Sequence, residues 1–323
     1  MMNATTTEGR ALTPSVFVPS SVPEKTYYDL PFLKRPTWGW EIVLYFFLGG
    51  ISAGAFILAG LADFFGGNRH RQFVRRARYL SLGTLLPCPP LLIADLGRPA
   101  KFSHMLRVFK PESPMNTGAW ALFAYGQLAG IVAVLQSRKL MPARVQTGAE
   151  RAVSLAAQPF ALTILAYPGV LLSTTSTPIW ANRRFLGPLI GMSSLSAACD
   201  SLALVATDKP QTAAALDTVG RISHAAEASF LAAYIRQAGE TAAPVTRGRH
   251  APLFWAGVVG AGLILPELLR SKTRGTGSRK TSLLGTVLSL AGGLALKWIV
   301  VHSGRESAND PSANRAVSRG RTA

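Results

Sequence analysis

Ionisable side chains inside an apolar stretch are the first feature of this sequence that points to chemistry. Asp217, Arg221, His224 and Glu227 all lie between residues 213 and 235. On a helix, Asp217, Arg221 and His224 fall within about 60° of one another, and Glu227 lies about 60° further round. This spacing allows an Arg221–Asp217 ion pair and places His224 beside Arg221. Such a set forms either a proton ladder lining a polar cavity or a neutralised ion network that fixes helix packing.

Asp200 is an isolated carboxylate in the later half of another apolar stretch, residues 186–206. Alone in hydrocarbon, it would be protonated or paired with a cation from a different helix. We expect Arg221 to be that cation. The sequence is compatible with two roles for Asp200, a structural ion pair and proton transfer.

Histidine and cysteine are too sparse to predict a resident metal centre. Of the 5 histidines, only His224 lies deep in an apolar stretch, whereas a two-haem cytochrome b needs four buried axial ligands. The 2 cysteines, Cys88 and Cys199, do not form a CxxC motif. We therefore expect this protein to hold neither haem nor an iron–sulfur cluster of its own.

Long apolar segments must position these residues. The chain has 323 residues, of which 48% are hydrophobic and 15% are charged, against about a quarter charged in a soluble domain. Eight segments approach the ~20 residues that a helix needs to cross the hydrocarbon core. They are residues 41–63, 78–96, 118–136, 158–176, 186–206, 213–235, 251–269 and 282–301. We expect an all-α, polytopic membrane protein with about eight transmembrane helices and proline kinks in the second and fourth.

The two ends of the chain differ from this transmembrane region, residues 40–302. Residues 1–39 are polar and contain several prolines, without the basic start and short apolar core of a signal peptide. We expect the first span to stay in the membrane as an anchor. Residues 303–323 are rich in Ser, Asn and Arg and predict a disordered basic tail.

The net charge of +18 indicates membrane topology rather than nucleic-acid binding, because the Lys and Arg residues fall between the apolar segments. Two short connections carry the densest positive charge. They contain Arg69, Arg71, Arg75, Arg76 and Arg78, and Arg270, Lys272, Arg274, Arg279 and Lys280. Such connections stay in the cytoplasm and attract anionic lipids. We therefore expect both termini on the outer side of the inner membrane.

Three short motifs surround the first two predicted spans. They read W-G-W-E at 38–41 with Y-F-F-L-G-G-I-S-A-G at 45–54, D-L-G-R-P at 95–99, and S-P-M-N at 113–116. Gly97 and Pro99 end a helix at the interface, and Asp95 and Arg98 can pair there at i,i+3. Ser113 followed by a proline is typical of a capped helix start.

In their order and spacing these motifs resemble the NrfD family, the membrane subunits of polysulfide-reductase-type complexes. The resemblance covers roughly residues 38–125 and extends weakly to about 302. It implies two four-helix bundles without haem. It also implies electron exchange between the membrane quinone pool, menaquinone or ubiquinone, and a ferredoxin-like iron–sulfur subunit. That subunit usually connects to a molybdopterin or other catalytic subunit.

The resemblance further implies a quinone pocket near the outer face, among the start of the first span, the end of the second and neighbouring helices. Trp40, Glu41, Tyr45, Asp95 and Arg98 match that region. We expect Glu41 or Asp95 to accept protons from a quinol, and Arg98 or Tyr45 to donate a hydrogen bond to a quinone oxygen.

Two other functions stay open from the sequence alone. A proton-coupled transporter would use the ionisable residues between 213 and 235, and would show ion flux without a redox partner. Transporters often contain an inverted repeat, and none is visible here. A passive membrane anchor for a peripheral complex would use the motifs only for packing.

Overall fold

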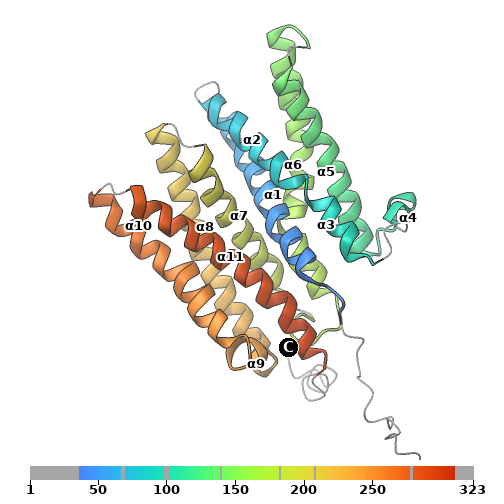
Figure 1. The fold of residues 1–323 in the computed structure, drawn as a ribbon. Coiled ribbons are helices and arrows are strands. Elements are labelled where there is room, and N and C mark those ends of the chain that lie inside the picture. The colour runs from blue at the N-terminus through green and yellow to red at the C-terminus, as the bar shows by residue number, and fades with distance from the viewer. Residues whose placement is uncertain are drawn as a thin grey trace, which may run out of the picture.

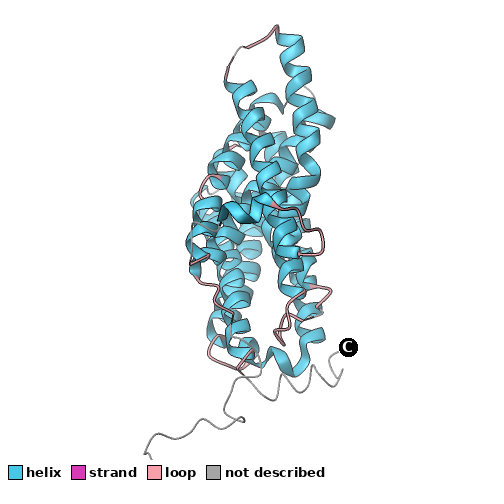
Figure 2. Cartoon of the chain, turned by 90° about the vertical axis from the view of Figure 1, so that its right-hand side faces the viewer, coloured by secondary structure: helices cyan, strands magenta, loops and turns pink. Residues whose placement is uncertain are grey.

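The computed structural model describes residues 36–66, 70–97, 102–138, 140–181, 183–206, 209–276 and 279–309. Arg98, most of the predicted N-terminal tail and the chain from residue 310 onward lie outside these ranges. Within them the chain forms helices and no strands, as Figure 2 shows. The all-α prediction is confirmed.

The helices follow the predicted apolar segments closely. They are α1 (Trp40–Gly66), α2 (Arg71–Leu85), α3 (Cys88–Asp95), α4 (Phe102–Arg107), α5 (Pro114–Ser137), α6 (Ala143–Ser173), α7 (Leu186–Val205), α8 (Pro210–Ala238), the short 3₁₀-helix η4 (Gly239–Ala242), α9 (Ala243–Thr246), the π-helix η5 (Leu253–Ile264), α10 (Leu265–Thr276) and α11 (Arg279–Ser307). The last helix therefore continues beyond residue 302.

Six of the described helices are long and apolar enough to cross a membrane. They are α1, α5, α6, α7, η5 with the first part of α10, and α11. The second predicted span is divided into α2 and α3, and α8 carries Asp217, Arg221, His224 and Glu227. The protein is a polytopic membrane protein, and the count of eight crossings stays a prediction.

Two groups of helices lie side by side in Figure 1. The first group contains α1, α2, α3, α5 and α6, and the second contains α7, α8, η5, α10 and α11. Helix α1 contacts α7 and α11, and so joins the two groups. Figure 1 places the start of α1 and the end of α11 at the same end of the molecule. We call this end the termini end, and we call the end that contains Gly66 and Arg71 the opposite end.

Local sequence signals explain where the helices that border the termini end begin and stop. The Ser113 side chain accepts a hydrogen bond from the backbone N–H of Asn116 over 3.4 Å, and Pro114 occupies the first turn of α5. This is the predicted cap. Helix α3 ends just before Gly97, whose φ of 65° is left-handed and favours glycine. The break between α2 and α3 falls at Pro87, the first proline of the segment.

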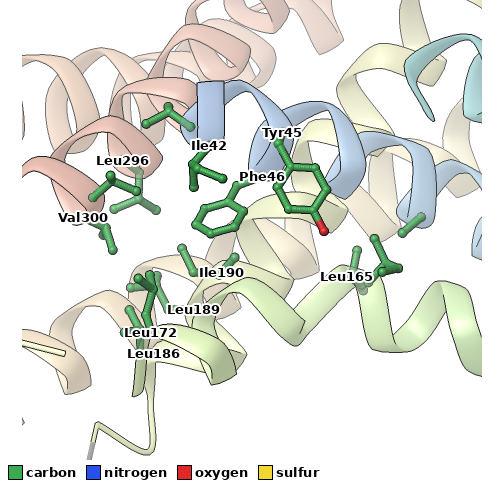
Figure 3. Packing of buried hydrophobic residues seen from close by; sticks show 14 of the residues in the cluster. Ile42, Tyr45, Phe46, Leu165, Leu172, Leu186, Leu189, Ile190, Leu296 and Val300 are labelled. Carbon is green, nitrogen blue, oxygen red and sulfur yellow. The ribbon is translucent and has the colours of Figure 1, made fainter. Parts of the chain in front are cut away.

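Small residues let α1 approach α7 closely. A Cβ atom on Gly54 would lie 2.6 Å from the Cβ of Ala198, so a larger residue would force the two helices apart. Nearer the termini end, apolar side chains fill the space between α1, α7 and α11. Figure 3 shows Ile42 and Phe46 together with Leu189, Ile190, Leu296 and Val300. This packing fixes the position of the first turns of α1.

Candidate functional site

A cavity of about 210 Å³ lies at the termini end of the first helix group. Residues of α1, α3, α5 and α6, and of the segment just before α1, line it. They include Trp38, Tyr45, Phe46, Asp95, Gly118 and Tyr167. The walls are mostly apolar and aromatic, and their polar groups include the Asp95 carboxylate, the phenols of Tyr45 and Tyr167 and the Thr37 hydroxyl. This composition is typical of a small-molecule site.

Asp95 ties the end of α3 to the start of α1. Its Oδ1 accepts a hydrogen bond from the backbone N–H of Gly39 over 3.3 Å. The Glu41 carboxylate folds back over Gly39 and lies close enough to Asp95 for the two carboxyl groups to interact. The two acids expected in the pocket therefore lie at the same end of the molecule, and Asp95 lines the cavity itself.

Aromatic residues shape the rest of the pocket. Tyr45 is almost fully buried. The Tyr167 hydroxyl donates a hydrogen bond to the carbonyl oxygen of Pro114 over 2.8 Å, and its ring lies directly against Gly118. The Trp38 ring stacks on Trp180, with centroids 5.6 Å apart. These contacts hold the aromatic walls in fixed positions.

The residues expected at this site separate into three sets. Tyr45 and Asp95 line the cavity. Glu41 lies beside it, whereas Trp40 is 53% exposed and is not part of the wall. Arg98 lies outside the described residues. Trp38 and Tyr167 were not among the candidates, although Trp38 belongs to the W-G-W-E motif.

A second set of buried polar groups crosses the interior of the second helix group. Asp200, on α7, forms an ion pair through Oδ1 with Arg270 of α10. Its Oδ2 lies 3.6 Å from Nε2 of His224 on α8. The prediction that Arg221 pairs with Asp200 was wrong. Helix α10 continues past the apolar segment that ends at residue 269, so Arg270, which we placed in a cytoplasmic loop, lies inside a helix that reaches α7.

Arg221 instead pairs with Asp217, with Nε and Oδ2 3.3 Å apart, as the i,i+4 spacing predicted. Both side chains are more than a third exposed. His224 and Glu227, on the same helix, are buried. The four residues therefore divide between a half-exposed pair and an interior pair.

Serine hydroxyls connect the interior groups to α7 and α11. The His224 Nε2 atom lies 2.6 Å from Oγ of Ser289. The Ser196 hydroxyl donates to Oε2 of Glu227 over 2.8 Å.

We refer to four buried residues as the polar line: Asp200 on α7, His224 and Glu227 on α8, and Lys297 on α11.

Lys297, on α11, is 1% exposed. Its Nζ donates to Oγ of Ser193 over 3.1 Å, interacts electrostatically with Glu227 and lies 5.7 Å from the centre of the Phe47 ring of α1. The sequence analysis missed Lys297, although a lone lysine in the apolar segment 282–301 was a visible signal.

The family model described as "Polysulphide reductase, NrfD" matches residues 30–307. The chain belongs to the NrfD family. The resemblance that the motifs carried over residues 38–125 is thereby confirmed across both helix groups.

Three curated relatives agree with this membership of the NrfD family. A component of the polysulfide reductase of Wolinella succinogenes is 29% identical over 301 residues, which cover 83% of this protein and 94% of the relative. Protein NrfD of Escherichia coli is 26% identical over 306 residues, which cover 83% of this protein and 95% of the relative. A putative membrane subunit of a dimethyl sulfoxide reductase of Halobacterium salinarum is 31% identical over 108 residues, 33% of this protein and 25% of the relative.

This NrfD-family protein thus combines a pocket in its first helix group with a line of ionisable groups in its second. Among the residues that the structure describes, no three His, Cys, Asp or Glu side chains gather as metal ligands would. The side chains of the pocket and of the polar line can form hydrogen bonds, exchange protons and contact an apolar ring.

Proposed function

We propose that this NrfD-family protein is a quinone- and quinol-interacting membrane subunit. In this proposal it passes electrons between the quinone pool and an iron–sulfur partner subunit of a respiratory oxidoreductase complex. The observation that carries the proposal is the aromatic cavity with Tyr45 and Asp95 in its wall. A ferredoxin-like iron–sulfur subunit and a molybdopterin catalytic subunit are the proposed partners, in keeping with the name of the Wolinella relative as one component of a polysulfide reductase.

The size of the cavity supports a quinone head group rather than a whole quinone. A volume of about 210 Å³ is below the roughly 300–1,000 Å³ of sites that enclose a complete drug-sized ligand. A single substituted ring fits such a space, and the isoprenoid tail would remain outside among the helices. Menaquinone and ubiquinone both meet this description.

The polar groups at the pocket suit the proton chemistry of a quinone. Oxidation of a quinol releases two electrons and two protons, and reduction of a quinone takes up the same number. Asp95 and Glu41 are the proposed proton acceptors, and Tyr45 and Arg98 the proposed hydrogen-bond donors to a quinone oxygen. The electrons would pass directly to a cluster of the partner subunit.

The polar line is the proposed route for proton transfer through the second helix group. Asp200, His224 and Glu227 lie inside this group on α7 and α8. Arg221 lies outside the line, where it pairs with Asp217. Ionisable groups at such depth are costly in a membrane, which favours a functional role over packing alone.

Quinone binding to the purified protein tests the pocket directly. Because Trp38 lines the cavity, a bound quinone ring should quench its fluorescence. We expect saturable quenching by decylubiquinone or by a menaquinone analogue, and loss of most of that signal in Trp38→Phe. The control is Trp255→Phe, which changes an exposed tryptophan of the second helix group. A passive anchor would show no saturable quenching, and that result would reject the proposal.

A further inference from the structure

A second cavity, of about 350 Å³, lies at the opposite end of the second helix group. Its polar lining residues come from α7, α8, α10 and α11. They are Asp200, Asp217, Arg270, Ser282 and Thr286. At about 30 Å³ per liquid water molecule, this space holds roughly ten waters. Hydroxyl and charged groups on four helices give those waters hydrogen-bond partners, so the cavity is suited to be wet.

Asp200 forms the inner wall of this cavity. The carboxylate is 3% exposed, and Arg270 holds its Oδ1 atom. Its Oδ2 atom has no hydrogen-bond partner of normal geometry among the described residues, and the polar groups that lie near the carboxylate are the Ser289 hydroxyl and His224 Nε2, the latter 3.6 Å from Oδ2. A buried carboxylate oxygen without a hydrogen bond is unfavourable unless water or a proton satisfies it. The cavity that Asp200 lines has room for such a water.

The polar line continues from this oxygen into the helix group. His224 Nε2 lies 3.6 Å from Asp200 Oδ2, and Glu227 follows His224 by one helical turn on α8. Glu227 in turn interacts with Lys297. Lys297 reaches Phe47 of α1, the residue after Phe46 in the wall of the pocket. The line therefore extends from the cavity at the opposite end to the helix that carries the pocket.

We propose that the 350 Å³ cavity is the aqueous entrance of the proton path and that Oδ2 of Asp200 exchanges protons with its water. Arg270 is a positioning residue that fixes the carboxylate through Oδ1. Each quinone reduced to quinol consumes two electrons and two protons. Asp200 takes one proton at a time from a hydronium ion in the cavity and is restored when His224 accepts it. The assignment rests on the proposed quinone function for its proton demand, but the water-filled entrance is tested without it.

Cysteine accessibility tests the entrance independently of activity. In the assembled complex with Cys88→Ala and Cys199→Ala, we would introduce Thr286→Cys and, as the control, Thr163→Cys. Thr286 lines the cavity, whereas Thr163 lies on the exposed face of the apolar helix α6. A charged, membrane-impermeant methanethiosulfonate should modify Cys at 286 from the opposite-end side only, and should leave Cys at 163 unmodified. An unreactive thiol at 286, or reaction only from the termini end, would overturn the entrance.

Proton movement in proteoliposomes that contain the complex tests Asp200. We expect Asp200→Asn to slow the proton uptake that accompanies quinone reduction by on the order of 10²-fold, and Asp200→Glu to restore most of it. Because Asp200→Asn removes the carboxylate that pairs with Arg270, the double variant Asp200→Asn/Arg270→Gln, which lacks both charges, serves as a second test. Glu240→Gln, which changes an exposed carboxylate of η4 away from the cavity, is the matched control and should move protons normally.

The outcomes separate this proposal from the quinone function. Normal proton movement in Asp200→Asn and in the double variant would remove Asp200 from the path while leaving quinone chemistry intact. Absence of both quinone reduction and quinol oxidation in the unmodified complex would instead reject the quinone function. Reaction of Cys at 286 would still establish the entrance in that case.

Discussion

The backbone N–H of Gly39 donates a hydrogen bond to Oδ1 of Asp95 over 3.3 Å, across 56 residues of sequence. This bond joins the segment before α1 to the last turn of α3 and closes one wall of the 210 Å³ cavity. The same contact holds one oxygen of the Asp95 carboxylate in place at the wall of the pocket.

The first prediction concerns turnover at this pocket. Arg98→Ala, Asp95→Asn and Glu41→Gln should each lower quinol-dependent electron transfer per assembled complex. Removal of one preorganised donor or acceptor costs about 2–4 kcal/mol, or about 30- to 900-fold in rate. The measurement is the steady-state rate divided by the amount of intact complex.

A matched control separates chemistry from folding. Glu112→Gln changes an exposed carboxylate in the turn before α5 and should keep normal turnover. If Asp95 merely fastens the turn, its variant would yield less complex with a normal rate per complex. Near-normal turnover in all three pocket variants would place the quinone elsewhere.

The second prediction concerns the redox partner. The two cysteines are buried and unpaired by a disulfide, and the sequence has no CxxC motif, so the purified protein should show neither haem absorbance nor an iron–sulfur EPR signal. Electron transfer from a quinol analogue should appear only after an iron–sulfur subunit is co-purified. Stoichiometric haem in the isolated protein would refute this expectation.

The third prediction concerns orientation in the membrane. Reporters fused after Gly66 and after Ser307 should give opposite signals, cytoplasmic and external respectively, because short Arg-rich connections stay inside. Alkaline phosphatase and green fluorescent protein fusions provide two complementary readouts. Equal signals at the two positions would contradict this orientation.

The fourth prediction concerns an ion network at the opposite end of the first helix group. Arg78, which we expected in a loop, lies inside α2 with its side chain 3% exposed, 2.9 Å from Asp63 and 3.8 Å from Glu150. Arg78→Ala removes the buried cation of this network and leaves Asp63 paired with Arg151 alone; breaking a buried ion pair in this way costs about 3–5 kcal/mol. Thermal unfolding in detergent should show this loss.

Arg151 supplies the comparison for Arg78. It pairs with the same Asp63 over 3.2 Å, but its side chain is 49% exposed. Arg151→Ala should therefore change stability by about 1 kcal/mol or less, because exposed pairs are screened by solvent. Equal losses in the two variants would mean that burial does not control the strength of this network.

Much of the fold could be predicted because its signals are local. The apolar length of each segment predicted the helices, and the Ser113 cap and the prolines after Leu86 predicted where helices begin or break. Residues that act locally were also identified: Asp217 and Arg221 pair along one helix, as their spacing required. The pocket residues Tyr45 and Asp95 came from motifs that recur in a family.

The long-range pairs could not be predicted in this way. Asp200 meets Arg270 across 70 residues, and the partner depends on how far α10 continues and which face it presents to α7. The sequence alone does not show whether a charged residue at the end of an apolar segment begins a loop or lies in a helix that continues. Lys297 differs, because a single lysine inside an apolar segment already marks an interior site.

The last prediction uses Gly118 to test whether the cavity wall determines quinone affinity. A methyl group at this position would overlap the ring of Tyr167. The hydroxyl of Tyr167 is bonded to the carbonyl of Pro114, so the ring cannot move away without losing that bond. Gly118→Ala should therefore break this hydrogen bond, displace a ring that lines the 210 Å³ cavity and raise the KM for quinol of the assembled complex. Gly126→Ala is the matched control, because the same helix α5 has open space around Gly126. Saturation kinetics with a quinol analogue should show a normal KM for Gly126→Ala and a raised one for Gly118→Ala. An unchanged KM in Gly118→Ala would mean that the quinone ring does not occupy this cavity.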